Sequence, residues 1–381
     1  MTKWQEVRLG DVCSSISETY HNKDEHVVLV NTSDVLEGKI LNHELVKNEK
    51  LKGQFKKTFK KDDILYSEIR PANKRFAYVD FDDTSNYIAS TKLMVLRPNK
   101  EKILSKFLFN ILKSKNIISE LQHLAETRSG TFPQITFSSE LAPMKILLPP
   151  MDIQKKIAVV LGVLDDKIEL NSKINNNLEQ QAQALFKQYF PDIKLGNKSI
   201  GEYLSPKRGK NLLSKDAVKG IVPVVAGGLS PATYHNQANT ITPVITISAS
   251  GANAGYVNLW HIPVWSSDSS FIDATITPYV YFWYVTLKMR QQEIFEAQTG
   301  SAQPHIYPQH IENMPIKEIN LGLVKKYNED ATPLYMLIGH NQQENTRLVA
   351  LRDALLPKLM SGEIDVSKVD INKFNAADML L

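Results

Sequence analysis

The sequence predicts an α/β (α+β) fold in which two similar globular domains alternate with two long helices. Three observations lead to this prediction: motifs occur twice in the same order, each copy holds a strand–turn–strand pattern, and each copy ends in a long heptad stripe. The 381 residues are 43% hydrophobic and 23% charged, which is typical of a chain that forms packed cores.

Four pairs of matched segments carry the first part of the repeat. The second pair reads ILYS and ITIS, and in each copy a polar turn and a second apolar run follow, as in a β-hairpin. The third pair is apolar and helix-like, and the fourth is a loop with glycine and proline. The pairs are residues 7–12 and 198–203, 64–67 and 245–248, 107–112 and 281–287, and 129–135 and 299–306.

The last part of each copy forms a long helix, and here the repeat has no gap. Matched residues lie at a constant offset, as in Asn171 with Asn341 (341 − 171 = 170). Apolar and Asn positions recur at steps of four and three, which indicates a coiled coil, and the first helix would be roughly 55 Å long. The predicted seam consists of Ile157, Leu161, Leu164, Ile168, Asn171, Asn175, Leu178 and Leu185 in the first helix and Leu334, Ile338, Asn341, Asn345, Leu348 and Leu355 in the second.

Capping and breaking residues predict where these helices begin and end. Asp152 is the expected N-cap of the first helix, and Pro191 should stop it. Pro333 predicts either a kink or a start of the second helix, and Gly362 marks its end. We expect the two helices to pair antiparallel, with the Asn layers fixing the register. The alternative is that each helix packs only on its own domain.

Composition limits the classes of protein that this chain can belong to. The net charge of +4 permits a polyanionic partner without requiring one. Cys13 is the only cysteine, which fits a reducing compartment and excludes a cysteine-rich zinc site. The N-terminus is polar, and no apolar run is long enough to span a membrane. We therefore expect a soluble, cytoplasmic protein with no membrane partner.

Three phrases of the sequence resemble the DNA-specificity subunit of type I restriction–modification enzymes. Asp62–Ser67 (DDILYS) resembles a strand-opening phrase of that family, with Asp62 where glycine is usual. Leu148–Ile157 (LPPMDIQKKI) resembles the start of its first helix, with Ile153 where glutamate is usual. Leu351–Ile364 (LRDALLPKLMSGEI) resembles its closing helix and tail. With the duplicated layout, the likeness covers residues 4–366.

The resemblance implies a non-catalytic subunit that binds double-stranded DNA at two short sequences separated by a fixed spacer. Its partners would be two methylation subunits and, through them, restriction subunits, and it would need no cofactor and no metal. The long helices would set the spacer and bind the methylation subunits. The implied domains are a first target-recognition domain (1–150), a spacer helix (151–190), a second target-recognition domain (191–320), a second spacer helix (321–362) and a tail (363–381).

Candidate DNA-contacting residues lie mainly on turns and loops. Arginine and asparagine can bind guanine and adenine edges with two hydrogen bonds, and lysines attract phosphates. The first hairpin turn and the loop at 128–129 supply most candidates in the first domain, and the matching places supply them in the second. The candidates are Arg70, Asn73, Lys74, Arg75, Arg128, Ser129, Lys56 and Lys57 in the first domain and Lys207, Arg208, Ser250, Asn253, Thr299, Ser301, Gln303 and His305 in the second.

Two other functions compete with sequence-specific recognition. A two-domain scaffold would bind protein partners and touch DNA only non-specifically, so its affinity would not depend on DNA sequence. A methyltransferase would bind its methyl donor, but residues 148–151 (LPPM) lack both the amide or acid before the prolines and the aromatic after them. No phosphate-binding loop or metal-nuclease pattern is present in the sequence.

Overall fold

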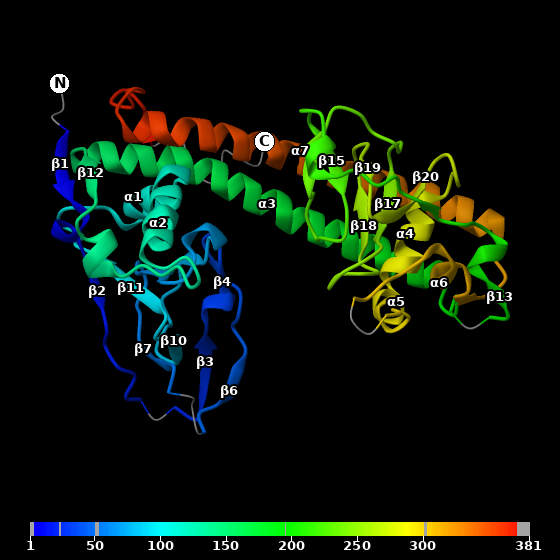
Figure 1. The fold of residues 1–381 in the computed structure, drawn as a ribbon, viewed down its shortest axis with the longest axis horizontal. Helices are drawn as coiled ribbons and strands as arrows, with labels where there is room; N and C mark the ends of the chain where they lie inside the picture. Colours follow the sequence, from blue (N-terminus) through cyan, green and yellow to red (C-terminus); the bar gives the residue numbers. More distant parts are fainter. Residues whose placement is uncertain (1–3, 23, 50–52, 195, 301–302, 372–381) are drawn as a thin grey trace. The chain divides into compact units, whose positions relative to one another are not determined.

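The computed structural model describes residues 4–22, 24–49, 53–194, 196–300 and 303–371. The chain divides into two compact units, which we call the first unit (Met1–Lys167 with Arg347–Leu381) and the second unit (Ile168–Thr346). Figure 1 shows the elements of both. The unit boundaries fall inside the two long helices, so each unit contains one part of each helix.

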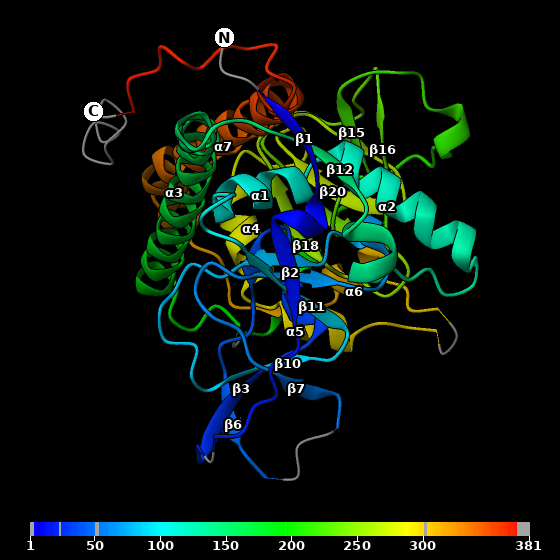
Figure 2. The same ribbon diagram turned by 90° about the vertical axis from the view of Figure 1, so that its left-hand side faces the viewer.

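The first unit has three layers. Its central sheet has the order β2-β11-β8-β9, a second sheet has the order β6-β3-β10-β7, and two pairs, β1-β12 and β4-β5, complete it. Helices α1 and α2 lie on one side of the central sheet, and the second sheet lies on the other (Figures 1 and 2). The elements are β1 (Gln5–Arg8), β2 (Cys13–Ile16), β3 (His26–Val30), β4 (Val35–Leu36), β5 (Lys39–Ile40), β6 (Leu45–Lys47), β7 (Phe55–Lys57), β8 (Ile64–Ser67), β9 (Phe76–Tyr78), β10 (Tyr87–Ser90), β11 (Leu93–Pro98), β12 (Lys145–Leu148), α1 (Ser105–Leu112) and α2 (Lys115–Arg128).

The second unit repeats this plan. Its central sheet has the order β14-β20-β17-β18, which matches that of the first unit element by element, beside a sheet β16-β15-β19 and a pair β13-β21. The elements are β13 (Lys198–Ser199), β14 (Lys207–Arg208), β15 (Val222–Val225), β16 (Thr233–His235), β17 (Val244–Ser248), β18 (Val257–Trp260), β19 (Trp265–Ser266), β20 (Ser269–Asp273), β21 (Pro315–Ile316), α4 (Val280–Lys288), α5 (Gln291–Glu296) and α6 (Pro308–Glu312).

Alternating side chains explain the layers. In β8, Ile64 and Tyr66 pack with the core that contains α1 and α2, while Leu65 faces the core shared with the second sheet. In β17, Ile245 packs with α4, and Val244 packs with the core of the smaller sheet. The predicted hairpins are therefore present as β8–β9 and β17–β18, both antiparallel.

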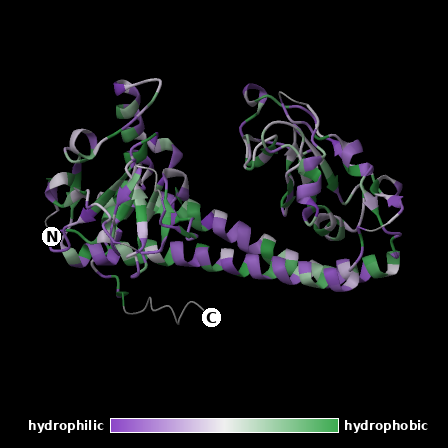
Figure 3. Cartoon of the chain, turned by 90° about the horizontal axis from the view of Figure 1, so that it is seen from below, coloured by the Kyte–Doolittle hydropathy of each residue, from purple (hydrophilic) through white to green (hydrophobic). Residues whose placement is uncertain are grey.

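The two long helices are α3 (Met151–Tyr189) and α7 (Leu321–Met360). Both carry hydrophilic and hydrophobic residues along their length (Figure 3). The expected N-cap at Asp152 was wrong, because the helix begins one residue earlier and Asp152 lies in its first turn. A helix start at Pro333 was also wrong: α7 begins at Leu321 and continues through the proline. Buried Ala331 and Tyr335 hold the helix on both sides of Pro333, and such packing outweighs a local propensity.

Candidate nucleic-acid interface

In the first unit, the turn between β8 and β9 is hydrogen-bonded to the loop after α2. Ile69 forms a β-bridge with Gln134. The Arg70 amide donates to the Pro133 carbonyl at 3.1 Å, and the Ile135 amide donates to the Glu68 carbonyl at 2.8 Å. Two segments that lie more than sixty residues apart in the sequence therefore form one backbone unit, which we call the first tip.

The second unit forms the same contact with the same hydrogen bonds. Ser250 bridges His305, the Gly251 amide donates to the Pro304 carbonyl at 3.1 Å, and the Ile306 amide donates to the Ala249 carbonyl at 2.9 Å. The offsets are constant on each side of the contact (251 − 70 = 249 − 68 = 181; 304 − 133 = 306 − 135 = 171). We call this unit the second tip. The candidate loops of the sequence repeat thus meet in pairs, once per unit.

The residue at the centre of each tip has a left-handed backbone. Gly251 has φ +83°, which glycine adopts without strain. Its counterpart Arg70 has φ +44°, where a side chain costs about 1–2 kcal/mol. Lys74, at the other end of the same turn, has φ +53°. Strained residues of this kind are concentrated at functional sites, which makes the first tip a candidate site.

Among the candidates of the first turn, some side chains are exposed and form no hydrogen bond to a described residue, and others form an ion pair or hydrogen bonds. Arg70 and Asn73 are exposed, and neither side chain bonds to another residue within the described part of the chain. Lys74 pairs with Glu37 at 2.7 Å, and both are exposed, so the pair can open at little cost. Arg75 instead donates to the Ser33 and Val35 carbonyls at 2.8 and 3.4 Å, so we leave it out of the proposed interface.

The first tip is joined by a cation, Lys92, that the sequence analysis did not single out. Lys92 Nζ lies 3.3 Å from Glu68 Oε2 and 3.0 Å from Gln134 Oε1, and so joins both segments of the tip. Arg128 pairs with Glu140 at 3.3 Å, and the Ser129 hydroxyl accepts from the Phe132 amide. No local pattern marks Lys92, because its partners lie 24 and 42 residues away in the chain.

The predicted lysine patch is only partly available. Lys56 is exposed on β7. Lys57 Nζ donates to the Thr91 and Leu93 carbonyls at 2.9 Å each, and burial lowers the pKa of its ammonium group. Because this half-buried ammonium group already donates to two carbonyls, we leave Lys57 out of the proposed interface.

In the second unit, an arginine and an aspartate join the tip. Lys207 and Arg208 are exposed on the short edge strand β14. Arg208 Nη2 donates to Asp268 Oδ1 at 2.8 Å, and the Ser250 hydroxyl donates to Asp268 Oδ2. Asp268 was not predicted, for the reason that applies to Lys92: its partners are distant in sequence.

The remaining candidates of the second unit lie at the rim of the second tip. Thr299 is exposed, and its amide donates to the His305 carbonyl at 3.0 Å. The His305 ring stacks on Tyr307, with ring centres 5.9 Å apart. Asn253 is half-buried, and Gln303 is exposed. Ser301 lies outside the described residues.

The predicted seam has a polar centre and apolar ends. In the second unit, Asn171 Nδ2 donates to Asn345 Oδ1 at 2.8 Å, and Asn341 Nδ2 donates to Asn175 Oδ1 at 2.8 Å. These pairs run antiparallel, since 171 rises to 175 while 345 falls to 341. The apolar seam residues pack into the core of their own unit: Ile157, Leu161 and Leu355 in the first, and Leu178, Leu185, Leu334 and Ile338 in the second. Leu164, Ile168 and Leu348 are half-buried.

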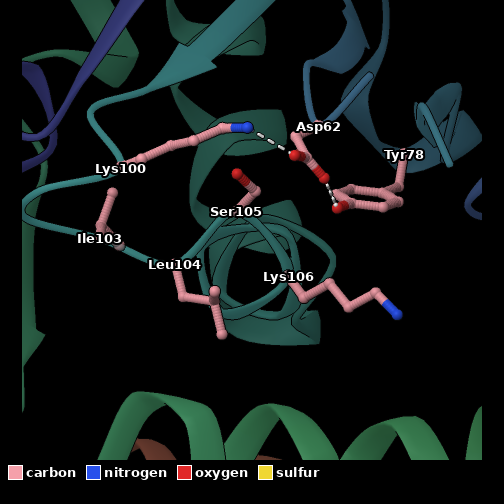
Figure 4. Close-up of a pocket in the computed structure, with 7 residues that line it drawn as sticks. All are labelled: Asp62, Tyr78, Lys100, Ile103, Leu104, Ser105 and Lys106. Carbon is pink, nitrogen blue, oxygen red and sulfur yellow. Dashed lines mark hydrogen bonds and ion pairs between the residues drawn. The ribbon is translucent and has the colours of Figure 1, made fainter. Parts of the chain in front are cut away.

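A pocket of 270 Å³ in the first unit is lined by Asp62, Tyr78, Lys100, Ile103, Leu104, Ser105 and Lys106 (Figure 4). Lys100 pairs with Asp62 at 2.6 Å, and the Tyr78 hydroxyl donates to the same carboxylate. Burial acts to raise the pKa of Asp62, but the hydrogen bonds from Lys100 and Tyr78, together with the charges of Lys100 and Lys61, outweigh it and hold that pKa below its usual value. The polar groups thus satisfy each other, and among the described residues no cluster of three metal-ligating side chains is found.

Comparison with known proteins shows similarity to one family over part of the chain. Residues 1–180 match the family model of the type I restriction modification DNA specificity domain. The chain is 42% identical over 247 residues to the type I restriction enzyme HindI specificity subunit of Haemophilus influenzae, which covers 63% of this chain and 53% of that protein. It is 26% identical over 317 residues to the MjaIX specificity subunit of Methanocaldococcus jannaschii, covering 71% of each.

A solved structure shares the fold. The S subunit of a type I restriction–modification system from M. genitalium superposes with a TM-score of 0.55 at 18% identity, over 96% of this chain and 97% of that one. In the described part of this chain, no helix has the length and apolar character of a membrane span. The aligned region covers only about half of the Haemophilus protein, and over that region the chain is similar to a DNA-specificity subunit of a type I restriction enzyme.

Proposed function

We propose that this chain directs a type I restriction–modification enzyme to a split double-stranded DNA sequence, with each unit binding one half-site. The observation that carries the proposal is the tip, which occurs once in each unit with the same pair of backbone hydrogen bonds. A ligand with two half-sites suits a protein that builds the same contact surface twice.

The exposed candidate side chains of the two units have the chemistry that DNA requires. Arg70 and Asn73 supply donors and acceptors that fit guanine and adenine edges. Lys56, Lys74 and Lys207 supply positive charge for phosphates, which fixes the register of the protein on the duplex without reading sequence. Because the backbone of each tip is held by two hydrogen bonds, its side chains are presented with little loss of conformational entropy.

The similarity to specificity subunits suggests the partners. We propose that the chain assembles with two methylation subunits and, through them, with restriction subunits, and that those partners carry the chemistry. In this proposal residues 1–150 and 191–320 are the target-recognition domains, and residues 151–190 and 321–362 are helices that set the spacer and contact the methylation subunits. Residues 363–381 are the tail.

The test is methylation across a genome after co-expression of this chain with its methylation subunit, compared with a strain that lacks this chain. A methylated split motif that disappears without the chain is the expected result. Methylation that persists, or a stable complex with no motif, would favour the scaffold function. A variant with Arg70→Gly and Asn73→Ala should lose one half of the motif and keep the other.

A further inference from the structure

We infer that Arg208 reads a guanine in the half-site of the second unit, and that Asp268 positions it to do so. This inference rests on the proposed function. It adds the identity of one recognised base and the roles of Arg208 and Asp268. The two side chains come from different elements: Arg208 from the edge strand β14, and Asp268 from the residue before β20.

The guanidinium of Arg208 is hydrogen-bonded to Asp268, but most of its N–H donors remain available. One N–H, on Nη2, donates to Asp268 Oδ1 at 2.8 Å, and in the described part of the chain it makes no other hydrogen bond. The guanidinium has five N–H donors in a planar fork, so four remain for a ligand. The side chain is 41% exposed, which leaves these donors open to solvent.

Asp268 is itself fixed to the second tip. Its Oδ2 accepts from the Ser250 hydroxyl, and its carbonyl accepts from the Ala249 amide at 3.1 Å. The carboxylate therefore links Arg208 to the turn that the repeat marks as the DNA-facing segment. A charged hydrogen bond of this kind sets the direction of the fork as well as its position.

The backbone beside Arg208 is also constrained. The Gly209 amide donates to the Ser269 carbonyl at 2.8 Å, and the Lys210 amide donates to the Ser266 carbonyl at 2.9 Å. A Cβ on Gly209 would lie 2.5 Å from the Ser266 carbonyl oxygen, so the strands approach as closely as they do only because residue 209 has no side chain. Arg208 is thus fixed at its backbone and at its head group.

An arginine held in this way fits guanine better than phosphate. Guanine presents O6 and N7 side by side in the major groove, and a planar fork binds both at once. A phosphate accepts from such a fork too, but it can also be bound by charge alone, which the neighbouring Lys207 supplies from an exposed position with no ion pair to a described residue. Lys207 is the neighbour of Arg208 on the same short strand and is also exposed, so it is the matched control.

The experiment compares Arg208→Ala, Arg208→Lys, Asp268→Asn and Lys207→Ala in the intact complex with the methylation subunits. The methylated motif is determined for each, and binding is measured to DNA with each base pair of the motif replaced in turn. Arg208→Ala and Arg208→Lys should both lose discrimination at one G·C pair by roughly 10-fold or more, since a bidentate contact contributes about 1–3 kcal/mol. Lys207→Ala should weaken all sequences alike and lower the salt dependence by about one ion.

Asp268→Asn tests the positioning role, because it keeps the shape of the side chain and removes its charge. It should relax discrimination at the same G·C pair, with the melting temperature of the complex unchanged. The double variant with Arg208→Ala should be no worse than Arg208→Ala alone, since both substitutions remove one contact.

The outcomes separate this inference from the proposed function. If the unaltered chain gives no split motif, the proposed function fails. If it gives a motif and Arg208→Ala weakens every sequence equally, Arg208 contacts phosphate and the inference is overturned. Full discrimination in Arg208→Lys would overturn it as well, because lysine keeps the charge without the fork.

Discussion

The two tips share the same backbone hydrogen bonds, but at one matched position their side chains have opposite charge. In each, the residue before the second strand of the central sheet accepts a backbone hydrogen bond from the turn: Lys92 from Glu68 at 3.0 Å, and Asp268 from Ala249 at 3.1 Å. One position thus holds a cation in the first unit and an anion in the second. The fold repeats the scaffold of the site, and the side chains on it are free to differ, as two half-sites of different sequence would require.

A second contrast lies along the helices. In the first unit, α3 and α7 meet through charges: Asp165 accepts from Lys113 at 2.7 Å and from Arg352 at 2.8 Å. In the second unit they meet through an amide layer: Asn171 is 1% exposed and donates to Asn345 Oδ1 at 2.8 Å and to Glu344 Oε2 at 2.6 Å. The charged layer also attaches both helices to the end of α1, which Lys113 follows, whereas the amide layer joins only the helices to each other.

This contrast predicts the largest effect on stability. Asp165→Ala leaves Lys113, whose side chain is only 13% exposed, without its closest carboxylate, and leaves Arg352 with Asp353 alone. Breaking a buried ion pair costs about 3 kcal/mol or more, and partial exposure of Asp165 holds the expected loss near the lower end. Hydrogen exchange of the intact chain should show the loss in α1 and in the first-unit part of α3.

The matched substitution in the second unit is Asn171→Ala, for which we expect a smaller loss of about 2 kcal/mol, because one of the two hydrogen bonds of Asn171 goes to a carboxylate. Its partners Asn345 and Glu344 are half-buried and can be hydrated when the amide is removed. An equal or larger loss for Asn171→Ala would contradict the view that the ion pairs of Asp165 make the first layer the stronger one.

Much of the fold follows from the sequence, because its signals are local. The duplication, the two hairpins and the two long helices all appear as periodic patterns or repeated phrases. The site is different. Lys92 and Asp268 become candidates only when strands distant in sequence are in register, and Lys57 is removed from the interface by carbonyls that lie 34 and 36 residues away. Tertiary register, which no local pattern encodes, decides which charges are free.

Another prediction concerns the loss of stability of the second unit at low pH. His261 packs beside the rings of Tyr281 and Tyr335 and against Gly339 of α7. Burial lowers the pKa of His261 to about 4, from 6.5. The unfolded chain therefore binds a proton on this residue below pH 6.5 while the folded chain does not, so stability is lost as the pH falls from 6.5 toward 4.

The expected loss is about 2 kcal/mol between pH 7 and pH 4, after allowance for the partial exposure of the ring. Hydrogen exchange in α7 and β18 as a function of pH measures it. His261→Phe keeps a ring at this position and cannot titrate, so it should flatten the pH dependence of these segments. A variant as acid-sensitive as the original chain would assign the effect to other groups.

The smallest expected change in stability gives the sharpest test of the tips. Arg70 and Gly251 occupy the same place, and both have positive φ, so glycine is the substitution that removes the arginine side chain without adding strain. Arg70→Gly should leave stability within about 1 kcal/mol of the original, because relief of the left-handed strain offsets the extra entropy of the unfolded chain. Affinity for the recognised DNA should still fall by roughly 10-fold.

The reciprocal substitution separates backbone from side chain. A Cβ on Gly251 would meet no atom within 4 Å, so Gly251→Ala should cost only the strain of a left-handed alanine, about 1 kcal/mol, and leave the tip hydrogen bonds in place. Thermal unfolding and binding to the recognised DNA, measured on both variants, decide the matter. If Arg70→Gly binds DNA as tightly as the original chain, the Arg70 side chain does not contact the DNA. The repeated tip would then have only a structural role in both units.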